Sequence, residues 1–173
     1  MNAWICLLRA VNVGGTGKLP MADLRRLCTE AGFADVRTYI ASGNVVCRSG
    51  KGEAGVKQAL EAALQDYAGR PVGVQVRSPD EMAAVLAGNP FPDAPGNRCL
   101  AVFLDMPPAA DVLDDLRGQN GEQVAVGARE IYIHYGEGMA DSRLRIPAAA
   151  KGTARNMNTI AKLVAMAREA EVD

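Results

Sequence analysis

The stretch from Val36 to Cys47, VRTYIASGNVVC, decides the fold of the first half of this chain. Val36–Ala41 is rich in strand-forming residues, and residues 45–47 resume an extended chain of the same kind. Between them, Ser42-Gly43-Asn44 supplies residues that favour a tight turn. The stretch therefore predicts a β-hairpin.

The elements on either side of this hairpin extend the pattern. Ala3–Val11 is a nearly continuous apolar run, which indicates a strand at the centre of a sheet or buried on both faces. After a turn at Asn12–Lys18, Pro20 stands in the first turn of a one-faced helix that Gly32 ends. Glu53–Ala68 then has one apolar face, as a helix does, and Pro71–Val76 alternates like a strand. The order strand, helix, strand, strand, helix, strand is that of a ferredoxin-like unit, whose antiparallel sheet is covered by helices on one face.

The remaining residues predict a second unit of related order. Ser78–Ala87 has the start signal of a short helix, and the breaker-rich loop at 89–96 reads as a connection. The elements that follow are a strand at Cys99–Leu104, a helix at Ala110–Leu116, hairpin strands at Glu122–Val126 and Glu130–Tyr135, and a closing helix at Asn156–Ala170. We therefore predict an α+β fold of two ferredoxin-like (βαββαβ-type) halves with antiparallel sheets covered by helices. The first half spans residues 1–77, the helix and proline-rich connection 78–97, and the second half, with a basic C-terminal helix, 98–173. No fixed-period repeat relates the halves.

Composition places the chain among globular proteins, with 173 residues of which 49% are hydrophobic. The only apolar run at the N-terminus, Ala3–Leu8, is too short for a signal-peptide core or a spanning helix. We therefore expect a cytoplasmic protein without a membrane partner. Its cysteines have no close pairs and are expected to be reduced and mostly buried; they are Cys6, Cys28, Cys47 and Cys99.

Charge is unevenly distributed although the net charge is −1. Residues 1–77 carry ten Lys/Arg and six Asp/Glu, residues 78–141 carry three and eleven, and residues 142–168 carry six and none. Such an acid-free segment attracts anions: phosphates, nucleic acid, or the acidic middle of the same protein.

The loop Gly14-Gly15-Thr16-Gly17-Lys18 resembles a phosphate cradle, because glycines let backbone N–H groups approach an anion and Lys18 adds charge. It is neither a Walker A loop nor a dinucleotide fingerprint, since Asn12, Leu19 and Pro20 break those patterns. The alternative is a plain strand-to-helix turn that needs positive φ.

Two other segments are candidates for the same site. Ser42 and Asn44 offer a hydroxyl and an amide that could orient a ligand, or they only form the turn. Arg155, Asn156, Thr159 and Lys162 stand at the predicted start of the closing helix, where cations and the helix dipole favour an anion; helix capping is the alternative. We expect the Asn12–Lys18 loop and this helix start to converge on one anion site, with Arg9 nearby.

Other chemistries have less support. His134 is the only histidine, and the strand pattern places it on a face away from Ile131 and Ile133, as an exposed and dispensable residue. No spacing resembles a metal site, so neither a metal nor a cofactor is expected. The nucleic-acid mode of RRM domains is disfavoured, because such domains stack bases on aromatic residues of the first and third strands, whereas here those strands read Ile-Cys-Leu-Leu and Val-Val-Cys-Arg.

Three segments together resemble one protein family. They are Arg9-Ala-Val-Asn-Val-Gly-Gly15 with Lys18 and Pro20-Met21; Thr38-Tyr-Ile-Ala-Ser-Gly-Asn-Val-Val46; and Thr153-Ala-Arg-Asn-Met-Asn-Thr159 with Lys162-Leu163. The chain resembles the DUF1697 family of bacterial proteins of unknown function nearly end to end. The resemblance implies two ferredoxin-like halves and no established activity. Where that family typically has Trp after Arg-Asn, this chain has Met157.

Three hypotheses of function follow. The first is a protein that binds a phosphate-bearing ligand, whether nucleotide, phosphometabolite or nucleic-acid backbone, as a monomer or weak homodimer. The second is a small-molecule enzyme using the same pocket, with Arg9, Asn12 and Arg155 orienting substrate and Ser42 or His134 in chemistry. The third is a structural or regulatory interaction module, in which residues 142–168 dock on the acidic region 78–141 of the same or another chain.

Overall fold

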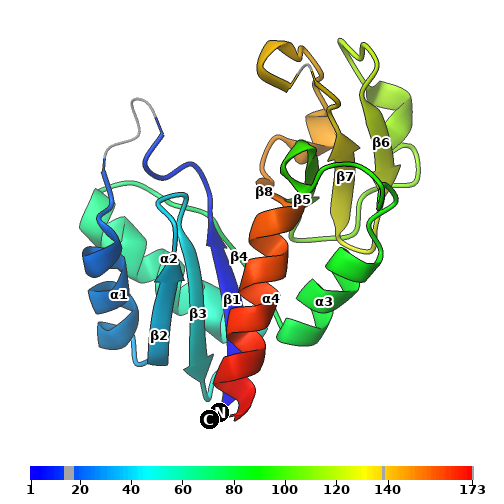
Figure 1. Ribbon diagram of the computed structural model, residues 1–173. Helices are drawn as coiled ribbons and strands as arrows, with labels where there is room; N and C mark the ends of the chain where they lie inside the picture. Colours follow the sequence, from blue (N-terminus) through cyan, green and yellow to red (C-terminus); the bar gives the residue numbers. More distant parts are fainter. Residues whose placement is uncertain (14–17, 138, 173) are drawn as a thin grey trace. The chain divides into compact units, whose positions relative to one another are not determined.

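The computed structural model describes residues 1–13, 18–137 and 139–172. They form two compact units, here called the first unit (Met1–Met82 and Lys162–Asp173) and the second unit (Ala83–Ala161). Each unit contains one four-stranded antiparallel sheet (Figure 1). The α+β class and the two ferredoxin-like halves are thus confirmed.

The first sheet has the strand order β2-β3-β1-β4, as a ferredoxin-like sheet requires. Its elements are β1 (Asn2–Leu8), α1 (Met21–Glu30), β2 (Ala34–Tyr39), β3 (Asn44–Ser49), α2 (Glu53–Ala68) and β4 (Val74–Arg77). The predicted hairpin is present, with Tyr39 opposite Asn44. Gly32, at φ 94°, follows the end of α1 as expected.

Both faces of the first sheet are covered, which corrects the expectation of helices on one face. Cys6 and Leu8 of β1 pack into a core with α1 and α2. Ile5 and Leu7 point to the other face and are also fully buried. On that face Arg37, which lies opposite Val46, donates a 2.6 Å hydrogen bond to the carbonyl of Met166 in α4 (Met157–Val172). Burial on both sides explains why β1 reads as a continuous apolar run.

The second sheet repeats the strand order as β6-β7-β5-β8. Its strands are β5 (Cys99–Phe103), β6 (Gln123–Val126), β7 (Glu130–His134) and β8 (Thr153–Asn156). The helix α3 (Pro79–Ala87) precedes it, and the predicted start signal of α3 forms: the amide of Glu81 donates to Ser78 Oγ at 3.1 Å.

Two predictions for the second half are wrong. The helix expected at Ala110–Leu116 is only a single 3₁₀ turn, η2 (Val112–Asp115), because the segment is short, rich in Asp, and buries only Val112. The strand β8 was not predicted, because it places polar Thr153 and Arg155 in buried positions. Three further 3₁₀ turns are η1 (Gly96–Arg98), η3 (Met139–Asp141) and η4 (Pro147–Ala149).

Candidate functional site

One edge of the first sheet gathers the loops that carry most of the predicted site residues. The backbone at the end of β1 joins two of these loops. Leu8 donates its amide to the carbonyl of Gly43 in the β2–β3 turn, and Arg9 donates to Gly73 just before β4, both at 2.9 Å. The end of β1 and the hairpin turn thus lie at the same edge of the sheet. We call this edge the loop end of the first sheet.

Asn12 holds the loop end together through its side-chain amide. Its Oδ1 accepts a 2.6 Å hydrogen bond from the Leu19 amide, while its Nδ2 donates to the carbonyls of Leu19 at 2.9 Å and Ala41 at 2.7 Å. These three bonds close the base of the loop between residues 12 and 19 and tie it to the hairpin turn. The Asn12 side chain therefore acts as a local clamp.

The backbone at the loop end adopts conformations that side chains disfavour. Ala10, Asn12 and Ile40 have φ values of 53°, 55° and 51°, in the left-handed region. For a β-branched residue such as Ile40, which is half exposed, this conformation is a genuine outlier. Strained residues of this kind cluster at binding and catalytic sites, so the loop end is the first place to look for one.

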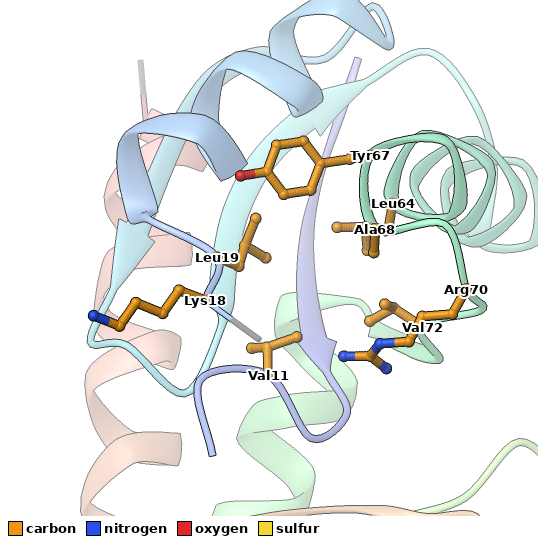
Figure 2. Close-up of a pocket in the computed structure, with 8 residues that line it drawn as sticks. All are labelled: Val11, Lys18, Leu19, Leu64, Tyr67, Ala68, Arg70 and Val72. Atoms are coloured by element: carbon orange, nitrogen blue, oxygen red, sulfur yellow. The ribbon is translucent and has the colours of Figure 1, made fainter. Parts of the chain in front are cut away.

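A pocket of about 280 Å³ opens at the loop end (Figure 2). We call it the loop-end pocket. The residues that line it are Val11, Lys18, Leu19, Leu64, Tyr67, Ala68, Arg70 and Val72. They come from the loop after β1, the C-terminal turn of α2, and the segment that leads into β4. The clamp at Asn12 positions two of them, because it fixes the chain directly beside Val11 and at Leu19.

Charge at the loop-end pocket is positive. Among the described residues that line it, Lys18 and Arg70 are cations and none is a carboxylate. Figure 2 shows the Arg70 guanidinium reaching toward Val11 along the pocket edge, whereas the Lys18 ammonium points away and its aliphatic stem borders the pocket. Tyr67 donates a 2.8 Å hydrogen bond to Asp23 at the start of α1, and this bond raises the pKa of the phenol.

The predicted site residues of the first half differ in what their side chains do. Arg9 is exposed beside Gly73, and Ser42 is half-buried in the hairpin turn. Asn44 is fully buried, and its amide donates to the Tyr39 carbonyl and to Ser42 Oγ, so it supports the turn from inside. Gly14 and Gly15 lie outside the described residues.

The candidates around residue 155 lie in other surroundings than expected. The predicted closing helix begins at Met157, and Arg155 is a strand residue of β8 that donates to the Ala154 carbonyl at 2.8 Å. Burial lowers the pKa of Arg155 to about 10, which still leaves it charged at neutral pH. Asn156 caps the helix, accepting a 2.9 Å hydrogen bond from the amide of Thr159.

Arg155, Asn156 and Thr159 belong to the second unit, whereas Lys162 and the Asn12–Lys18 loop belong to the first. Their convergence on one anion site stays a prediction.

His134 is not the exposed strand residue that the pattern suggested. Its ring packs 5.5 Å from the Phe91 ring, centroid to centroid, and its Nδ1 lies 2.9 Å from Gln123 Oε1. The neighbouring Tyr132 is buried and donates to the Val85 carbonyl of α3 at 2.8 Å. The face of β7 that carries both residues is therefore covered, and His134 has a packing role there.

Sequence reasoning missed Tyr67 and Arg70 as site residues. Tyr67 lies in the C-terminal turn of an amphipathic helix and Arg70 in the short loop after it. An aromatic ring and a cation are ordinary surface residues at such positions, so neither residue stands out in the sequence. The signal that could have found them is the fold itself, because in a βαββαβ unit the chain returns from the second helix to the edge where the first strand ends.

Two features are absent from the described part of the chain. Among residues 1–13, 18–137 and 139–172, no group of three or more His, Cys, Asp or Glu side chains is placed to hold a metal ion. In the same part of the chain, no helix has the length and apolar character needed to cross a membrane. The four cysteines are buried and unpaired, as predicted.

Comparison with known proteins agrees with this architecture. The structure resembles that of the conserved bacterial protein SP0830 from Streptococcus pneumoniae, with a TM-score of 0.76 and 22% sequence identity over 95% of this chain and 98% of that chain. At that identity the likeness shows the fold alone. No curated protein gives a significant sequence match. The sequence pattern of DUF1697, described as a protein family of unknown function, matches residues 1–132, and this chain therefore belongs to that family.

Proposed function

We propose that the protein binds a small phosphate-bearing anion in the loop-end pocket. The observation that carries the proposal is the pocket's place and charge: it opens at the loop end beside Lys18, Arg70 reaches along its edge, and the described lining residues include both cations. A guanidinium can hold two phosphate oxygens at once, and a lysine adds a point charge.

The strained backbone at the loop end supports the same proposal. Ala10, Asn12 and Ile40 are held in left-handed conformations by the clamp at Asn12 and the bonds of the hairpin turn. Strain of about 1–3 kcal/mol per residue is retained when it preorganises a site. Preorganisation favours a rigid binding site for a compact ligand over a surface that adapts to many partners.

Thermal unfolding with a panel of anions tests the proposal. A ligand at ten times its Kd stabilises a protein by about 1.4 kcal/mol, which corresponds to about 3–6 °C for a chain of this size. We expect phosphate esters to raise the melting temperature of the wild-type protein, measured against chloride at equal ionic strength.

Two variants with matched changes of charge localise the effect. Arg70→Ala should abolish the stabilisation. Lys51→Ala should keep it, because Lys51 is an exposed cation just after β3, at the opposite end of the sheet. If no phosphate ester stabilises the wild-type protein, or if the two variants respond alike, the proposal is wrong.

A further inference from the structure

Five of the eight described residues that line the loop-end pocket are aliphatic, and they share the lining with the polar groups of Lys18, Tyr67 and Arg70. Val11, Leu19, Leu64 and Val72 are each less than 10% exposed, at 4%, 6%, 1% and 5%. They form the pocket's floor, with the Tyr67 ring on one side. A bare phosphate or sulfate would gain nothing from these side chains, because its oxygens need hydrogen-bond donors.

The size of the pocket restricts the ligand further. Its volume of about 280 Å³ lies just below the range of small-molecule sites, about 300–1,000 Å³. A complete nucleotide, with its base and sugar, is too large and too polar for such a space. A ring or a short branched chain fits, provided that its charged group stays at the edge where Arg70 lies.

We propose that the ligand of the loop-end pocket is a phosphate monoester with a compact apolar body. Its phosphate lies against Arg70 at the pocket edge, and its aliphatic or aromatic group rests on the floor formed by Val11, Leu19, Leu64 and Val72. This inference rests on the proposed function and adds the chemical class of the ligand.

The test compares two esters of equal charge and similar size, phenyl phosphate and glycerol phosphate, by isothermal titration calorimetry with the wild-type protein. The first has an apolar body and the second a polar one. We expect phenyl phosphate to bind at least about tenfold more tightly, since burying a ring on an apolar floor removes apolar surface from water. Tight binding of phenyl phosphate should also show a negative heat-capacity change.

Each outcome decides a different point. Equal affinities for the two esters would overturn the apolar-body inference and leave anion binding intact. Binding of neither ester would overturn both proposals. A preference for glycerol phosphate would also overturn the inference, because it would indicate a polar floor.

A pair of variants checks that the preference comes from this pocket. Val72→Thr keeps the size of the side chain but places a hydroxyl on the floor, so it should lower the affinity for phenyl phosphate about threefold or more and leave glycerol phosphate unchanged. Val126→Thr makes the same change at an exposed position that does not line the pocket, so the preference should remain. An unchanged preference in folded Val72→Thr protein would contradict the proposed position of the apolar body.

Discussion

Replacing Gly43 by alanine should destabilise the protein strongly, because two independent constraints meet at this residue. Its φ of 90° lies where an L side chain is strained. A Cβ atom at this position would also lie 2.7 Å from Val11 Cγ2 and 2.9 Å from Leu8 Cβ, well inside contact distance. Conformational strain costs about 1–2 kcal/mol and forced overpacking about 1–3 kcal/mol.

The net loss follows when the unfolded state is included. Alanine lowers the conformational entropy of the unfolded chain, which stabilises the folded state by about 0.4–1 kcal/mol. We therefore expect Gly43→Ala to lower the free energy of unfolding by about 2–4 kcal/mol, measured by urea denaturation. Because the clash displaces Val11, the same variant should weaken anion binding in the loop-end pocket.

Two other glycines separate the contributions. Gly69 has a φ of 71°, and a Cβ atom there would have no neighbour within 4 Å, so Gly69→Ala carries the conformational strain alone and should cost about 1 kcal/mol. Gly50 has open space and no such strain, so Gly50→Ala should leave stability within about 0.5 kcal/mol or raise it slightly. If Gly43→Ala matches Gly69→Ala, the close packing of the hairpin turn on β1 is not real, and the described loop end is wrong.

Four further variants test other parts of the structure. Asn12→Ala removes three hydrogen bonds and replaces a residue that tolerates left-handed φ. It should lower the free energy of unfolding by about 2–4 kcal/mol. If Asn12 only contacted a ligand, the stability of the free protein would not change. Leu7→Ala, at a fully buried position, should cost about 2–5 kcal/mol in urea denaturation; a loss below about 1 kcal/mol would contradict its burial. Burial and a nearby carboxylate raise the pKa of Tyr132 to about 12, above its value of about 10 in the unfolded chain. The stability that this tyrosine contributes should therefore be complete below about pH 10 and fall as the pH rises toward 12. Tyr132→Phe should flatten that fall. His134→Ala should cost about 1 kcal/mol through lost packing and leave anion binding unchanged; lost binding in folded protein would favour an enzyme that uses this histidine.

The elements of the first unit were predictable because local patterns there agree with the tertiary structure. The helix Glu53–Ala68 was predicted with its observed bounds, since one apolar face and a following glycine at φ 71° define it locally. The hairpin of β2 and β3 followed from strand formers around Ser42-Gly43-Asn44. In such regions the period of apolar residues and the turn chemistry point to the same structure.

The second unit was harder to predict because its elements depend on contacts distant in sequence. The strand β8 has no apolar alternation and exists because its backbone pairs with β5, with Ala101 opposite Arg155. The turn η2 lacks enough apolar residues to continue as a helix. Local propensity carries little information when pairing with a distant strand decides the conformation.

The candidate site was predicted in part, for similar reasons. Arg9, Asn12 and Ser42 were candidates for one anion site, and all three lie at the loop end. The sequence pattern did not show that the Asn12 side chain would donate hydrogen bonds to the carbonyls of Leu19 and Ala41. Such partners depend on how the loop closes in the folded protein. Arg70 lies at the pocket because the chain returns to the loop end of the sheet after α2.

An NMR titration of isotope-labelled protein with phenyl phosphate tests the central claim most directly, because it reports where the anion binds. We expect saturable chemical-shift changes at the amides of Leu19 and Val72 and at the Nε of Arg70, with the amide of Lys51 unaffected. Shift changes confined to residues 142–161, or an absence of saturable changes anywhere, would contradict it.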